Sequence, residues 1–185
     1  MFVYAVDEEI TLRLLDVKDA HELFRLTDRS REYLREWLPW VDETRTVLDS
    51  KDFIRYAWQS YEERLGLILG VYYQGKLCGM MGYNQFDWAN RAGVIGYWQG
   101  KDFQGLGIIT RATSALIDYG FQNLGLHRIE IRAAMENIKS RKIPERLGFT
   151  IEGQIRQGEW LYDHFVDLVV YGLLANEWEM VRGNR

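Results

Sequence analysis

The chain has 185 residues, of which 47% are hydrophobic and 27% are charged, and its formal net charge is -4. This length and composition are typical of one globular domain, and no apolar run approaches the roughly 20 residues of a membrane-spanning helix. The acidic balance argues against extended binding of nucleic-acid phosphates and suits a cationic ligand such as an amine or a basic protein tail. Cys78 is the only cysteine and the three histidines are scattered, so we predict neither a disulfide nor a metal site.

The first 65 residues are mainly helical in pattern. Residues 10–14 alternate as a strand does, and Asp16 then begins a helical pattern. The apolar residues that we place on helix faces are Ala20, Leu23, Phe24 and Thr27, then Tyr33, Leu34, Trp37 and Leu38 up to Pro39, then Phe53, Ala57, Tyr61 and Leu65. Residues 1–10 lack a basic segment followed by an apolar core, so we expect no secretory signal and a cytoplasmic protein.

The chain changes character at Gly66, because all 17 glycines lie at or after it. We predict strands at 67–73, 76–83, 93–98, 129–135, from 149 and at 165–174, a helix from Ile108 that ends near Gly125, and a short helix over 140–147. Gln74-Gly75 joins the first two strands as a hairpin turn. The expected fold is a single α/β domain of the α+β type over 1–185, with a mixed, mostly antiparallel sheet of six to seven strands flanked by helices.

Between the strand at 93–98 and the helix that follows lies the segment Gln104-Gly105-Leu106-Gly107-Ile108-Ile109. Glycines let the main chain approach a ligand closely, and the first N–H groups of a helix have no intrahelical partner. Such a loop binds a phosphate or diphosphate well. An ordinary strand-to-helix turn with two glycines is the alternative.

Five motifs in order resemble the GCN5-related N-acetyltransferase superfamily, and within it the group that acetylates the N-termini of ribosomal proteins. They are Ile95-Gly96-Tyr97-Trp98 with the glycine loop, Asn137-Ile138-Lys139-Ser140 with Leu147-Gly148-Phe149, Glu152-Gly153, Asp167, and Glu177-Trp178. The resemblance spans nearly the whole chain. It implies an enzyme, an acetyl-CoA-dependent N-acetyltransferase, whose sheet is splayed around the acetyl-CoA site. Residues 1–65 would then form the acceptor side, and 66–185 the acetyl-CoA-binding core.

The resemblance also implies which residues bind acetyl-CoA. The main-chain N–H groups of Gln104, Gly105, Leu106, Gly107, Ile108 and Ile109 would bind the pyrophosphate. Tyr97 and Trp98 would line the strand end where the pantetheine arm enters, and Asn137 would contact that arm. The alternatives from the residues themselves are core aromatic packing for Tyr97 and Trp98 and a helix N-cap for Asn137.

By the same resemblance Ser140 would protonate or stabilise the leaving thiolate, and Glu159 would act as the general base, directly or through a water. The alternatives are a serine in an ordinary first helical turn and a glutamate in an exposed turn. His164 is a second candidate base because its usual pKa lies near neutrality. Pro144 cannot donate to the carbonyl of Ser140, so we expect the short helix to kink or to begin late.

Tyr33, Trp37 and Trp40 are the candidates for the acceptor wall, with ordinary packing as the alternative. A ribosomal or other protein N-terminus is the favoured acceptor. The other candidates are a small-molecule amine (a polyamine, an aminoglycoside or an amino-acid conjugate) and a CoA-binding sensor without turnover. We expect no metal, no nucleic-acid or membrane partner, and we consider a homodimer, which is common in this group.

Overall fold

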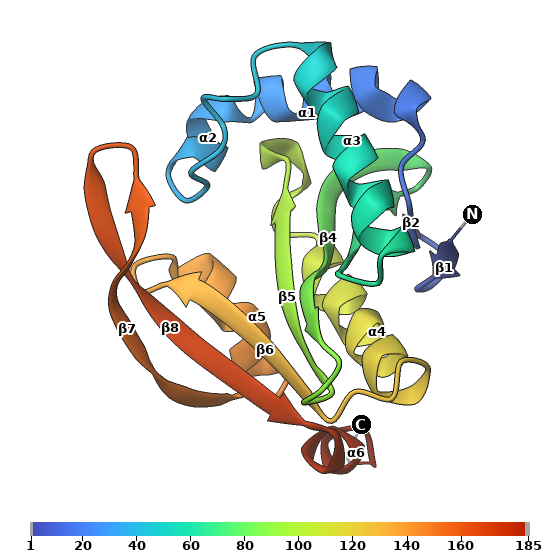
Figure 1. Cartoon of the computed structure of the whole chain (residues 1–185), viewed down its shortest axis with the longest axis vertical. Coiled ribbons are helices and arrows are strands. Elements are labelled where there is room, and N and C mark those ends of the chain that lie inside the picture. Colours follow the sequence, from blue (N-terminus) through green and yellow to red (C-terminus); the bar gives the residue numbers. More distant parts are fainter. Residues whose placement is uncertain (1, 184–185) are drawn as a thin grey trace.

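Residues 2–183 of the computed structural model form one eight-stranded sheet in the order β1-β2-β3-β4-β5-β6-β8-β7, with helices on both faces (Figure 1). The strands are β1 (Val3–Ala5), β2 (Ile10–Arg13), β3 (Leu67–Tyr73), β4 (Lys76–Asp87), β5 (Ala92–Gln99), β6 (Arg128–Ala134), β7 (Thr150–Leu161) and β8 (His164–Leu174). Only β5 and β6 pair in parallel. The predicted mixed, mostly antiparallel sheet is confirmed, with one strand more than expected, because β1 is too short to show an alternating pattern. The predicted domain ends Met1, Asn184 and Arg185 lie outside the described residues.

The helices are α1 (Ala20–Arg29), α2 (Arg31–Arg35), α3 (Val47–Glu62), α4 (Ile108–Gln122), α5 (Ile138–Arg146) and α6 (Ala175–Gly183), with 3-10 turns η1 (Val17–Asp19) and η2 (Lys101–Phe103). Asp16 caps η1 and Thr46 caps α3, each in a reciprocal capping box. Across residues 2–183 no helix is both long and apolar enough to cross a bilayer.

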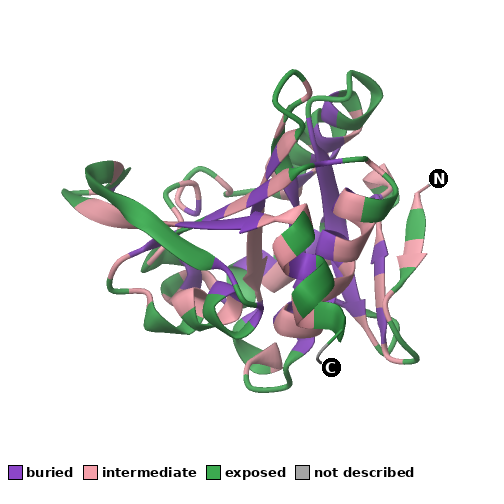
Figure 2. Cartoon of the chain, turned by 90° about the horizontal axis from the view of Figure 1, so that it is seen from below, coloured by how far each residue is buried: buried purple, intermediate pink, exposed green. Residues whose placement is uncertain are grey.

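The central strands are buried on both faces, whereas β7 is mostly exposed (Figure 2). Along β3, Leu67, Leu69 and Val71 pack in the core that includes the apolar face of α4, and Ile68 and Tyr72 pack in a second core with α1 and α3. Successive side chains of a strand point to opposite faces, so one strand serves both cores. Cys78 is fully buried in the first core, and burial raises the pKa of its thiol to about 12.

Two predictions about the helical region are wrong. The helix expected through Trp37 and Leu38 ends at Arg35, and turns follow it up to Thr44. On α3 the buried residues are Ser50, Ile54, Ala57 and Ser60, so Ala57 is buried as expected, whereas Phe53 and Tyr61 are exposed. Leu65 is also exposed and lies beyond the end of the helix at Glu62. Helix α3 carries small polar residues on its buried face and large apolar residues on its exposed face, so the apolar periodicity does not identify the buried face.

Other local predictions are closer to the structure. The hairpin turn at Gln74-Gly75 has positive φ at both residues, 49° and 79°, as its tight geometry requires. Helix α4 ends at Gln122, before Gly125, whose φ of 68° is left-handed. Helix α5 begins at Ile138, two residues earlier than predicted, and runs through Pro144, so the late start that we expected from this proline is wrong.

Candidate active site

The site begins where the two parallel strands separate. β5 and β6 pair from Ala92↔Arg128 to Ile95↔Ile131 and no further, although β5 continues to Gln99 and β6 to Ala134. Figure 1 shows β5 and β6 diverging beyond this paired stretch. Beyond Ile95, β5 keeps its pairing with β4, while its other edge has no strand partner within residues 2–183. A polar main-chain edge is therefore available to a ligand.

A cavity of about 850 Å³ fills this opening. Its wall comes from β4, β5, β6, α1, the first turns of α3, the segment between α2 and α3, the start of α5, and the β7–β8 hairpin. The sequence-predicted site residues that line it are Tyr97, Trp98, Asn137, Ser140, Glu159, Trp37 and Trp40. Tyr33, His164 and the loop residues Gln104 to Ile109 lie outside the lining. The cavity thus brings together residues more than 100 positions apart in the chain.

The glycine loop lies between η2 and α4. Gly105 and Gly107 have φ of 79° and 69°, and a Cβ on either would meet nothing within 4 Å. Gly105, Leu106 and Gly107 are exposed, whereas Ile108 and Ile109 are buried, so the open main chain of this loop lies just before the helix start. The loop therefore fits a diphosphate: its backbone is open to approach, and the helix N-terminus adds a favourable dipole. Lys139 of α5 lies beside it, with Nζ 3.1 Å from the Gln104 side-chain oxygen.

Asn137 begins α5, and its side-chain oxygen accepts from the Ser140 N–H at 3.2 Å. The residue is therefore an N-cap that also lines the cavity. The hydroxyl of Tyr97 donates to the Ser140 carbonyl at 3.0 Å. Burial raises the pKa of Tyr97 above its usual range, so the phenol keeps its proton.

Glu159 lies just after an irregular stretch of β7. The register with β8 passes from Ile155↔Leu168 to Glu159↔Val166, so β7 contains two extra residues there. Burial raises the pKa of Glu159 above the usual glutamate range. A half-buried carboxylate whose pKa is raised in this way is a stronger base than an exposed one. His164, by contrast, is exposed, and its Nδ1 lies 2.6 Å from the Asp163 carboxylate.

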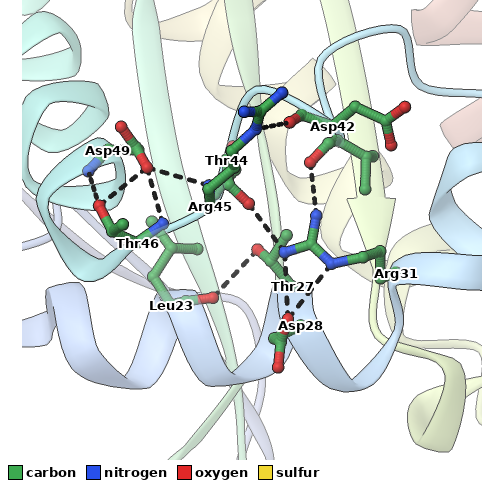
Figure 3. Close-up of polar contacts among 10 residues, drawn as sticks. Leu23, Thr27, Asp28, Arg31, Asp42, Thr44, Arg45, Thr46 and Asp49 are labelled. Atoms are coloured by element: carbon green, nitrogen blue, oxygen red, sulfur yellow. Dashed lines mark hydrogen bonds and ion pairs between the residues drawn. The ribbon is translucent and has the colours of Figure 1, made fainter.

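One wall of the cavity is formed by the segment between α2 and α3. The Arg31 guanidinium holds it at two carbonyls, that of Val41 at 2.6 Å and that of Thr44 at 2.8 Å, and also bonds Asp28 (Figure 3). These bonds fix the turn that carries Glu43, a residue of the cavity wall.

The same segment is tied to the β7–β8 hairpin. The hydroxyl of Tyr162 donates to the Leu38 carbonyl, and the Arg35 guanidinium lies 3.8 Å from the centre of the Tyr162 ring. Arg35 also pairs with Asp42, with Nε 2.9 Å from Oδ1. Two parts of the chain more than 100 residues apart therefore meet over the cavity.

The sequence did not point to four charged residues and one amide that line the cavity, Glu43, Asp49, Asp52, Arg132 and Asn84. Asn84 follows the buried run of β4 at a register shift against β5, a position that alternation alone does not reveal. The Glu43 side chain has no hydrogen bond or ion pair within residues 2–183. Carboxylates outnumber cations among the lining residues, which include Glu43, Asp49, Asp52, Glu159 and one cation, Arg132. Asp49 accepts hydrogen bonds in the cap of α3, and Asp52 pairs with Arg55.

The sequence profile of the acetyltransferase (GNAT) domain matches residues 9–150. The chain belongs to this family. It is 42% identical over 180 residues, which are 97% of this chain and 98% of the relative, to the protein named "Putative ribosomal N-acetyltransferase YdaF" of Bacillus subtilis (strain 168). Over 171 residues, 92% of this chain and 96% of the relative, it is 26% identical to the ribosomal-protein-serine acetyltransferase of Escherichia coli (strain K12).

Among solved structures, the microcin C7 self-immunity acetyltransferase MccE, in complex with acetyl-CoA and AMP, superposes with a TM-score of 0.87. It is 31% identical, and the match covers 91% of this chain and 94% of that one. The GNAT fold and the family assignment that the motifs suggested are confirmed. This GNAT protein is an N-acetyltransferase that uses acetyl-CoA.

Proposed function

We propose that this enzyme acetylates the N-terminal α-amino group of a ribosomal or other protein, with Glu159 as base and Ser140 as acid. The observation that carries the proposal is that Tyr97, Ser140 and Glu159 line one cavity at the point where β5 and β6 part. Acetyl-CoA supplies the acetyl group as a thioester. The glycine loop would hold its diphosphate through the main-chain N–H groups of Gln104 to Ile109, with Asn137 and the open edge of β5 at Tyr97 and Trp98 along the pantetheine arm.

The proton steps suit an α-amine. An α-amino group with a pKa of about 8 is roughly one-tenth neutral at pH 7, whereas a lysine amine with a pKa of about 10.4 is almost wholly charged. Glu159 would accept the proton that the acceptor nitrogen loses as its bond to the acetyl carbon forms. The Ser140 hydroxyl would donate to the departing sulfur, a modest task because a free thiol has a pKa of about 8.5. Main-chain N–H groups near Tyr97 would stabilise the carbonyl oxygen.

The charge of the wall supports a cationic acceptor. The wall holds four carboxylates and one arginine, so negative charge is in excess even with Asp52 paired to Arg55, and this excess attracts an ammonium group and disfavours a phosphate. Trp37 and Trp40 lie on this side, and a protonated peptide end can also rest on an aromatic face. The ribosomal names of the relatives support this class of acceptor. A ribosomal acceptor implies that the enzyme is cytoplasmic. The homodimer stays a prediction.

A small-molecule amine is the second candidate acceptor. The rings of Trp40 and Trp98 have centroids 5.7 Å apart within the cavity wall, a surface on which a planar group can stack. MccE, whose solved structure contains AMP, and a spermidine N(1)-acetyltransferase of Escherichia coli, 26% identical over 146 residues, are relatives with small ligands or substrates in their names.

The test is thiol release from acetyl-CoA with three acceptor sets: peptides with a free N-terminus and no lysine, N-blocked lysine peptides, and small polyamines or aminoglycosides. Turnover with the first set alone is the expected result. Turnover with the small amines alone would identify a small-molecule amine as the acceptor. Binding of CoA without turnover on any set would favour a CoA sensor.

A further inference from the structure

The main-chain carbonyl of Ser140 lacks its helical partner. In an α-helix this carbonyl accepts from the N–H four residues later, which here belongs to Pro144 and does not exist. The carbonyl is partly buried, and a carbonyl shielded from water without a donor is costly, so native structures supply one from elsewhere. The donor is the hydroxyl of Tyr97, at 3.0 Å.

This hydrogen bond crosses the opening of the sheet. Tyr97 lies on β5, two residues beyond Ile95, the last residue that pairs with β6. Ser140 lies in α5, which is attached to the end of β6: the Asn137 N–H donates to the Ala134 carbonyl at 2.9 Å, and Arg141 Nη1 donates to the Met135 carbonyl at 2.8 Å. The bond from Tyr97 to Ser140 therefore joins the two diverging arms, and both residues line the cavity.

We propose that Tyr97 is a positioning residue for Ser140: its hydroxyl uses the carbonyl that Pro144 leaves unpaired to set the distance between α5 and β5. The inference rests on the proposed role of Ser140 as proton donor. A hydroxyl that must reach a departing sulfur needs a fixed main chain, because small misplacements of reacting groups lower rates steeply. The phenol of Tyr97 holds its proton, so this donor is present throughout the working pH range.

The first test compares Tyr97→Phe with a matched control. Tyr83 makes the same kind of bond, from its hydroxyl to the Leu116 carbonyl at 2.9 Å, but it lies in the core outside the cavity. We expect Tyr97→Phe to lower kcat about tenfold with little change in the KM for acetyl-CoA. Tyr83→Phe should lower the melting temperature and leave kcat unchanged. Equal losses of kcat in the two variants would overturn the proposal, because the effect would then follow destabilisation alone.

The second test adds Pro144→Ala to Tyr97→Phe. The alanine N–H gives the Ser140 carbonyl a helical donor, so the double variant should regain melting temperature. It should not regain kcat, because the link to β5 is still missing. Recovery of kcat together with melting temperature would show that Tyr97 only satisfies a buried carbonyl, and the proposal would be wrong.

The third test places Tyr97→Phe in a Ser140→Ala background. If Tyr97 acts through Ser140, the double variant has the same kcat as Ser140→Ala. Losses that multiply would overturn the positioning role while the role of Ser140 stands. Full kcat in Ser140→Ala alone would remove the proton-donor assignment, and the positioning role with it, and would leave the acetyltransferase activity intact.

Discussion

The carboxylate of Asp167 accepts a hydrogen bond from the main-chain N–H of Gln157 at 2.7 Å. Its second oxygen accepts from the Gln154 side chain at 2.5 Å. Gln157 lies in the irregular part of β7 that precedes Glu159 and has a positive φ of 49° there, and Gln154 lies in the paired stretch just before it. Asp167 therefore holds the bulge whose shape brings Glu159 to the cavity wall.

Asp167→Asn should lower kcat. The asparagine amide has only one oxygen, so its N–H₂ group would face either the Gln157 N–H or the Gln154 side chain, and one of the two hydrogen bonds that hold the bulge would be lost. We expect a loss of about fivefold to tenfold from the misplaced base. Steady-state kinetics with a free-N-terminus peptide checks this. Asp163→Asn is the control, since Asp163 lies on the same hairpin outside the cavity lining. Equal losses in the two variants would remove the role given to Asp167, and a loss in Asp163→Asn alone would favour His164 as base.

Glu159→Gln should change the pH dependence of kcat/KM. In the wild-type enzyme both Glu159 and the acceptor amine must lose a proton, so log kcat/KM should fall with a slope of about two below both pKa values. The variant should be slower at neutral pH, with a slope of about one. Full activity of the variant between pH 7 and 8 would exclude Glu159 as the base.

The same substitution also tests the raised pKa through stability. Because burial raises the folded-state pKa of Glu159, the folded protein binds this proton more tightly than the unfolded chain does. The stability present at low pH is then lost as pH rises from the usual glutamate range through the raised pKa. Urea unfolding should therefore show Glu159→Gln gaining stability over wild type near pH 7 and not near pH 4. An equal difference at both pH values would contradict the burial effect.

Gly107→Ala should raise the KM for acetyl-CoA. Its Cβ would meet no protein atom, but it would project from a left-handed residue at the start of α4, where the diphosphate is proposed to bind. Gly75→Ala carries a similar strain, about 1 kcal/mol, in a hairpin turn away from the cavity. We expect an increase of about tenfold in KM for Gly107→Ala alone, with both variants less stable. An unchanged KM would argue against the loop as the diphosphate site.

Tyr162→Phe should weaken acceptor binding. It removes the hydroxyl that ties the β7–β8 hairpin to the Leu38 carbonyl, so the segment that carries Trp37 and Trp40 becomes less fixed. The KM for the peptide acceptor should rise several-fold and the KM for acetyl-CoA should stay unchanged. A change in both KM values would indicate a general loss of structure.

The local geometry of the glycine loop and of the start of α5 could be read from the sequence, because its signals lie close together in the chain. Gly105 and Gly107 before an apolar helical pattern predict an open loop at a helix start, and Asn137 at the start of α5 predicts a cap; both lie within a few residues of the elements they serve. Pro144 also predicts locally that the Ser140 carbonyl lacks a helical donor.

The tertiary structure alone decided what meets across the sheet. Nothing local indicates that Tyr97 bonds Ser140, or that Glu43 shares a cavity with Glu159, because these pairs depend on where β5 and β6 part and on how the β7–β8 hairpin reaches the α2–α3 segment. The burial pattern of α3 has the same cause. Phe53 is partly exposed on the cavity wall and Ser50 is buried, because the packing of α3 beside the cavity, and not the periodicity of its apolar residues, determines which side chains are buried. Local patterns determine the elements of this acetyltransferase, and long-range packing determines the residues that share its cavity.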